Sequence, residues 1–195
     1  MSVRRNQGFT MIELLTAIVI VGVLAAFAVP AFKEVRLNSQ ISTISGDMAA
    51  TLNRARSLAI TTRSSVYVLK GAGSSITDVA AGSDWASGWR ILRGPTMAAS
   101  TQVSRVVRTG AYTDINVIVS DGLVDATGTA SGAAIDGFAF NNLGQLVTTA
   151  NLALAQAAIV ICAPGVTTER GRTLAISRIG RVTNNSVSNP ASCGS

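Results

Sequence analysis

The 195-residue sequence contains no histidine, and this absence removes several kinds of active site at once. Histidine is the commonest general base near neutral pH and the commonest metal ligand in proteins. Without it, the abundant serines and aspartates cannot form a Ser-His-Asp triad. The sequence also lacks a glycine-rich loop of the kind that binds phosphates. We therefore expect a protein that is not an enzyme, with no catalytic residues, no metal site and no cofactor.

Cysteine is scarce as well, since the chain has only Cys162 and Cys193, far apart and close to the C-terminus. No CxxC pair is present, and two thiols without histidine cannot make a closed zinc site. If the N-terminal segment carries the rest of the chain out of the cytoplasm, a disulfide bond between the two cysteines is favoured. Two free buried thiols are the alternative.

Charged residues make up only 13% of the chain, whereas 48% of the residues are hydrophobic. This composition favours a folded domain over a disordered chain. The charges are also unevenly placed: Arg4 and Arg5 precede an apolar run from Phe9 to Phe32 in which Glu13 is the only charged residue. The run has about the length that crosses a bilayer. It could be a plain membrane anchor, or a secretory signal peptide cleaved after Ala28.

A third interpretation takes the residues Gly8-Phe9-Thr10-Met11-Ile12-Glu13-Leu14-Leu15 together. With the short basic segment before them and the apolar run behind them, they resemble the class III leader of type IV pilins and type II secretion pseudopilins. The resemblance implies that a prepilin peptidase cleaves between Gly8 and Phe9 and methylates the new N-terminus at Phe9. It also implies that Glu13 is an assembly contact, pairing with the α-amino group of a neighbouring subunit.

Beyond the apolar run, the spacing of apolar residues first becomes that of an amphipathic helix. Apolar residues spaced three or four apart indicate one side of a helix packed on a core: Ile41, Ile44, Met48, Leu52, Ala55 and Ala59. We expect one long helix from about Thr10 to Thr62. The predicted divisions are a leader (1–8), a transmembrane or filament-core helix (9–32), the amphipathic half of the helix (33–62) and a β-rich globular head (63–195).

Short strands separated by turns follow the helix, so the predicted class is α+β, with a long N-terminal helix packed on an antiparallel β-sheet. We expect 184–195 to be a polar tail. The predicted strands are 65–69, 89–92, 102–108, 114–119, 137–140, 158–162 and a hairpin of 172–178 with 181–183.

The motifs of the head narrow the resemblance. A loop ending in Trp85-Ala86-Ser87-Gly88-Trp89, the stretch Phe140-Asn141-Asn142-Leu143-Gly144 and a final arginine-rich hairpin are similar to the GspH/FimT/FimU branch of minor pilins and pseudopilins. This resemblance covers essentially the whole chain and implies the type IV pilin fold.

The resemblance also implies a function. We expect a FimU-like minor pilin that helps initiate a type IV pilus at its tip complex, and so serves motility and adhesion. A GspH-like pseudopilin of type II secretion is the first alternative. The implied partners are other minor pilins or the major pilin, through the N-terminal helix, and the prepilin peptidase. The implied location is the bacterial inner membrane, single-pass with a periplasmic head, and then the pilus or pseudopilus.

A second alternative is a FimT-like minor pilin that binds DNA during natural transformation. The candidate residues form a basic C-terminal group: Arg170, Arg172, Arg178 and Arg181. Clustered arginines can neutralise phosphates. However, Gly171-Arg172-Thr173-Leu174 and Gly180-Arg181-Val182-Thr183 both lack the final arginine of the Gly-Arg-x-Arg element in DNA-binding relatives. No aromatic residues alternate with the arginines to stack on bases. We favour a solvated hairpin or a contact with neighbouring subunits.

Overall fold

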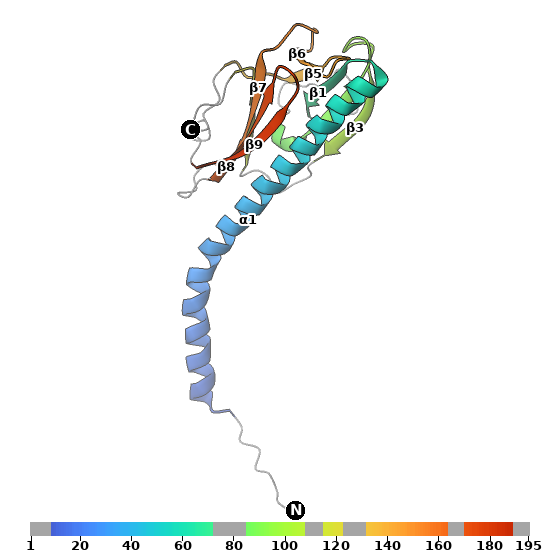
Figure 1. The fold of residues 1–195 in the computed structure, drawn as a ribbon. Helices are drawn as coiled ribbons and strands as arrows, with labels where there is room; N and C mark the ends of the chain where they lie inside the picture. The colour runs from blue at the N-terminus through green and yellow to red at the C-terminus, as the bar shows by residue number, and fades with distance from the viewer. Residues whose placement is uncertain (1–8, 72–84, 108–114, 123–131, 164–169, 189–195) are drawn as a thin grey trace, which may run out of the picture. The chain divides into compact units, whose positions relative to one another are not determined.

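The structure is a computed structural model that describes residues 9–71, 85–107, 115–122, 132–163 and 170–188 (Figure 1). Its contacts divide the chain into two compact units, Met1–Arg36 and Leu37–Ser195. One helix, α1 (Met11–Thr62), contributes to both units. Each unit is described by itself. The predicted α+β fold, with a long helix before an antiparallel β head, is confirmed.

The first unit contains the apolar part of α1. Its described side chains from Phe9 to Ala26 are all exposed, and Glu13 is the only charged one. Within the described residues, no helix is long and apolar enough to cross a membrane. The predicted transmembrane or filament-core role of 9–32 therefore stays a prediction, as do the other predicted divisions of the chain.

The second unit begins where α1 becomes amphipathic. The predicted apolar stripe is fully buried and is extended by one further residue, Leu37, toward the N-terminus. This spacing keeps every member of the stripe on one side of the helix, because three or four residues make one turn. Two side-chain hydrogen bonds also join α1 to the head: Trp89 Nε1 donates to Thr51 Oγ1 at 2.9 Å, and Asn184 Nδ2 donates to Ser45 Oγ at 2.8 Å.

The first sheet has five antiparallel strands in the order β3-β2-β1-β5-β6. The central strand β1 pairs with β2 on one side, where Tyr67 lies opposite Leu92, and with β5 on the other, where Val68 lies opposite Phe138. A short 3₁₀ helix (Trp85–Ser87) leads into β2. The strands are β1 (Val66–Lys70), β2 (Gly88–Arg93), β3 (Thr101–Val107), β5 (Gly137–Phe140) and β6 (Leu146–Val147).

The second sheet has four antiparallel strands in the order β4-β7-β8-β9. Strand β7 is buried along almost its whole length, which fits its apolar sequence. The strands are β4 (Asn116–Ser120), β7 (Gln156–Cys162), β8 (Arg170–Ser177) and β9 (Val182–Ser188).

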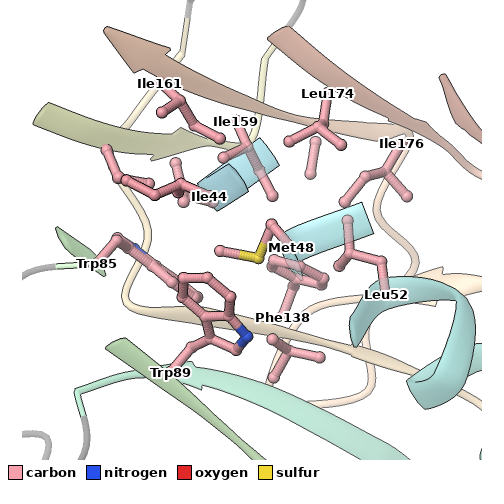
Figure 2. Packing of buried hydrophobic residues seen from close by; sticks show 14 of the residues in the cluster. Ile44, Met48, Leu52, Trp85, Trp89, Phe138, Ile159, Ile161, Leu174 and Ile176 are labelled. Carbon is pink, nitrogen blue, oxygen red and sulfur yellow. The ribbon is translucent and has the colours of Figure 1, made fainter. Parts of the chain in front are cut away.

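The main core lies where the stripe of α1 meets both sheets (Figure 2). In Figure 2, Met48 lies between Trp89 and Phe138 of the first sheet on one side and Ile159 and Ile176 of the second sheet on the other. Alternate residues of β1, β2, β4, β5, β7 and β8 contribute to this core, as the two-residue period of a strand requires. The first sheet is also buried on its other face, where a second cluster contains Tyr67, Leu69, Leu92, Ala139 and Val147.

Three details of the head were not foreseen. The strands form two sheets instead of one, and β6 was not predicted, because a two-residue strand has no readable period. The predicted polar tail from Asn184 is wrong for residues 184–188, which continue β9. There, Asn184 pairs with Leu174 and Asn185 with Thr173. The polar composition is compatible with a strand because β9 lies at the edge of its sheet.

Candidate functional site

The first turn of α1 is closed by a reciprocal pair of hydrogen bonds between Thr10 and Glu13. The backbone N–H of Glu13 donates to Thr10 Oγ1 at 3.3 Å, and the backbone N–H of Thr10 donates to Glu13 Oε2 at 3.0 Å. The Thr10 hydroxyl also donates to Glu13 Oε2 at 3.0 Å. This is a capping box, which satisfies backbone donors that the first helical turn leaves without partners. Glu13 is therefore the last residue of the cap as well as the only charge in this part of the helix.

Both bonds to the Glu13 carboxylate end on Oε2. Among the bonds of the described residues, Oε1 accepts none and is available to a donor from another molecule. The predicted cleavage and methylation sites lie beside this turn: Phe9 is exposed, and Gly8 lies outside the described residues. Phe9 and Glu13 are four positions apart in the sequence. Their roles in processing and assembly stay predictions.

The surface behind this turn is apolar all round the helix. Its large side chains are each more than half exposed: Phe9, Met11, Ile12, Leu14, Leu15, Ile18, Val19, Ile20, Val21, Val23 and Leu24. A helix that is apolar on every side is stable only when lipid or other helices cover it. Gly22 has no side chain, and open space surrounds the position of its β-carbon. Within its own unit, the described surface of this segment is apolar and exposed on every side.

The basic C-terminal group does not form one patch. Arg170 and Arg172 belong to one end of β8, whereas Arg178 and Arg181 lie in the turn at its other end, between β8 and β9. Arg178 follows Arg172 by six positions of extended chain, or about 20 Å. Arg178 and Arg181 are exposed and Arg172 is half-buried. The four arginines proposed as a DNA contact are therefore two separate pairs.

The pair at the turn belongs to a junction that the sequence did not predict. The β8–β9 turn meets the β5–β6 turn and the last turns of α1. Arg56 Nε donates to the carbonyl oxygen of Gly144 at 3.3 Å, and the backbone N–H of Leu146 donates to the carbonyl oxygen of Arg178 at 2.9 Å. Figure 1 shows these elements gathered at the end of the head where α1 finishes.

Two glycines make this junction possible. Gly144 and Gly180 have φ angles of +73° and +75°, in the left-handed region that favours glycine. A β-carbon on Gly180 would collide with the carbonyl oxygen of Gly144 and lie 2.9 Å from Arg56 Nε. A β-carbon on Gly144 would lie 2.7 Å from Ile60 Cδ1. Both glycines stood in motifs noted in the sequence, but no local pattern shows that two turns 36 residues apart meet.

Cys162 lies fully buried at the end of β7 and takes part in a disulfide bond. Its predicted partner, Cys193, lies outside the described residues. The Cys162–Cys193 pairing therefore stays a prediction.

Comparison with known proteins identifies the family. Residues 3–29 match the prokaryotic N-terminal methylation motif, and residues 45–180 match the family model of the type II transport protein GspH. The second match spans more than half of the chain. The chain belongs to the GspH family. The type IV pilin-like resemblance, carried by the Gly8–Leu15 stretch and the head motifs, is confirmed.

Individual relatives are similar to a short stretch of the GspH-family chain. It is 48% identical over 45 residues to the type IV major alpha-pilin of Moraxella bovis, and 46% identical over 45 residues to fimbrial protein Q of the same organism. These matches cover 23% of the chain, which spans less than a third of the length of these relatives (28% and 29%).

A solved structure extends the likeness to the fold of the whole head. The crystal structure of the type IV minor pilin FimU from Pseudomonas aeruginosa has a TM-score of 0.51 at 20% identity. The match covers 80% of the GspH-family chain and 92% of the FimU chain. The shared fold is the type IV pilin fold, with a long helix packed on antiparallel sheets.

Proposed function

We propose that this GspH-family chain is a minor pilin of a type IV pilus that helps to initiate filament assembly near the tip. Its N-terminal helix docks beside the corresponding helices of other minor pilins and of the major pilin. The β-rich head then faces outward from the helical core. In this role the protein is a structural subunit, and its processing requires a prepilin peptidase.

The observation that carries the proposal is the apolar first part of α1. From Phe9 to Ala26 every described side chain is exposed, and Glu13 is the only charge. Such a surface has to be covered by other helices in the filament, or by the inner membrane before assembly. We accordingly place the subunit first in the bacterial inner membrane with a periplasmic head, and afterwards in the filament.

The capping box supports a specific role for Glu13. Thr10 holds Oε2 in a fixed orientation, which leaves Oε1 for the α-amino group of a neighbouring subunit's Phe9. In an apolar filament core each of these charges would be costly alone, and pairing them relieves that cost. A carboxylate already oriented by its own helix loses less conformational freedom when it makes the contact.

The test of the proposal is the mature N-terminus of the protein made in its own cells. Mass spectrometry should find a chain that starts at methylated Phe9 and is recovered in sheared surface filaments. A chain that starts at Val29 would show signal-peptide cleavage after Ala28 and would contradict the proposal. A chain that keeps residues 1–8 would also contradict it.

A pseudopilin of type II secretion is the second candidate, and the match to the GspH model favours it. The leader, the fold and the use of Glu13 are the same in both machines, so a deletion strain has to separate them. Loss of surface pili and of twitching motility supports the minor pilin. Loss of protein secretion with normal piliation supports the pseudopilin.

DNA binding has weaker support, because the four arginines lie as two pairs at opposite ends of β8. A gel shift of the protein with duplex DNA at low salt tests it directly. Binding that is lost in the Arg178→Ala, Arg181→Ala double variant would make a DNA receptor the better function. We expect no shift.

A further inference from the structure

The end of the head where α1 finishes carries exposed aliphatic side chains from three separate segments. Leu143 in the β5–β6 turn is 67% exposed, Ile179 in the β8–β9 turn is 61% exposed, and Ile60 in the last turns of α1 is 45% exposed. Together with two arginines they define the junction surface: Arg56, Ile60, Leu143, Arg178 and Ile179. The junction of Gly144 and Gly180 lies beneath it.

The junction surface is held rigidly. Gly180 contacts Gly144, and Gly144 contacts Ile60, so closely that neither glycine has room for a methyl group without movement. Hydrogen bonds from Arg56 to Gly144 and from Leu146 to Arg178 fix the two turns to the helix and to each other. A surface that is ordered in advance loses little conformational entropy when a partner binds. Leu143 and Ile179 are largely exposed on this support, and Ile60 packs on Gly144 with part of its side chain exposed as well.

The charge of the junction surface restricts its partner. Its ionisable groups are all guanidinium groups, since none of the five residues is acidic. Arginine is enriched in protein interfaces because it is weakly hydrated and pairs with carboxylates in a fixed geometry. The aliphatic side chains favour a protein partner over nucleic acid, because bases stack on aromatic rings and none is present among the five.

We propose that the junction surface is the docking site for the head of another filament subunit, one that presents carboxylates among aliphatic side chains. This inference rests on the proposed function, because the family's N-terminal methylation motif implies assembly with other pilins. It goes further in naming the surface of the head that makes the contact and the chemistry of its partner.

Photo-crosslinking in cells that assemble the full chain tests the docking site. The crosslinker p-benzoylphenylalanine replaces Leu143 or Ile179, and in a control strain it replaces Leu152, which is also 67% exposed but lies in the β6–β7 turn. Mass spectrometry identifies the adducts. We expect positions 143 and 179 to capture a second subunit that carries an N-terminal methylation motif, and position 152 to capture at least about tenfold less.

Reversing the positive charge of the junction surface gives a second test of the docking site. Arg178→Glu should reduce the adduct at position 179 by about tenfold or more, because a partner rich in carboxylates would then be repelled. No subunit adduct at 143 and 179, equal capture at 152, capture of DNA, or no response to charge reversal would each overturn the inference. Mass spectrometry of the same samples reports processing at Phe9, so a failure of this surface is distinguished from a failure of the proposed function.

Discussion

Glu13 combines two tasks that a single substitution can separate. Its side chain caps α1 together with Thr10, and in the proposed filament its charge pairs with a neighbouring α-amino group. The sequence predicted the second task through a resemblance and missed the first. The missed signal was present, since Thr10 followed three residues later by Glu13 is the local pattern of a capping box.

We predict that incorporation into filaments depends strongly on the charge of Glu13 and only weakly on the helix cap. Glu13→Gln keeps the cap, because glutamine also serves in a capping box, but it removes the charge. Incorporation into sheared filaments should fall by more than about tenfold, since an unpaired buried charge costs several kcal/mol. Thr10→Val, which removes the hydroxyl and keeps the charge, should weaken the helix start by about 1 kcal/mol and reduce incorporation far less. Quantitative immunoblotting of filament and cell fractions measures both. Equal incorporation of Glu13→Gln and the unmodified chain would contradict the charge role.

The glycine junction gives a second prediction at the scale of residues. Gly180→Ala should destabilise the protein most, because its methyl group meets the rigid carbonyl of Gly144 and its φ of +75° is unfavourable by about 1–2 kcal/mol. Gly144→Ala should cost less, since the atom in its way is the flexible end of Ile60. Gly46→Ala, inside α1 with nothing within 4 Å, should stabilise by about 0.5–1 kcal/mol.

Urea unfolding of the three glycine variants in detergent measures these differences. The geometry requires the Gly180→Ala variant to be the least stable, the Gly144→Ala variant to be intermediate and the Gly46→Ala variant to be the most stable. A Gly180→Ala variant as stable as the unmodified protein would show that the two turns do not meet as described.

At the scale of elements, α1 was predictable and the short strands only partly so. The stripe from Ile41 to Ala59 repeats locally, and a helix needs only local hydrogen bonds, so the sequence was sufficient. Strand β7 was predictable because it is continuously apolar. Strand β9 was predicted only in its first part, 181–183, since its asparagines and serines resemble a tail. Its contact with Ser45 depends on a residue distant in the chain.

The shared core predicts that α1 is the element on which both sheets depend. Met48→Ala should lower the free energy of unfolding by about 2–5 kcal/mol, because Met48 is fully buried among side chains of both sheets. Ser57→Ala, on the exposed side of the same helix, should change it by less than about 0.5 kcal/mol. Chemical denaturation followed by tryptophan fluorescence compares the two, with Trp89 in the same core as the reporter. A small effect of Met48→Ala would contradict the central position of the helix.

At the scale of the whole molecule, the sequence predicted the family fold but not its arrangement into two sheets. Order within a sheet depends on pairings such as β1 with β5, which join residues about 70 positions apart and leave no local trace. The separation of the four arginines was missed for a different reason. Their closeness in sequence suggested one basic patch, whereas an extended β8 places them at opposite ends.

The predicted Cys162–Cys193 bond can be tested on the whole protein. Non-reducing mass spectrometry should find one intramolecular disulfide and no alkylatable thiol. Cys193→Ser should lower the free energy of unfolding by about 3–4 kcal/mol in the chain-entropy model for a loop of roughly 30 residues. Two alkylatable thiols, or a Cys193→Ser variant as stable as the unmodified chain, would contradict the pairing.

The separation in sequence between α1 and its cover has a consequence for the order of events during folding. The stripe on α1 is made well before Leu174 and Ile176, which pack against it, and before Asn184, which bonds to Ser45. The core of the head therefore cannot close until β8 and β9 have been synthesised. Until then the stripe on α1 is exposed to water. A premature stop before β8 would release a chain with an open core, suited to proteolysis and not to folding.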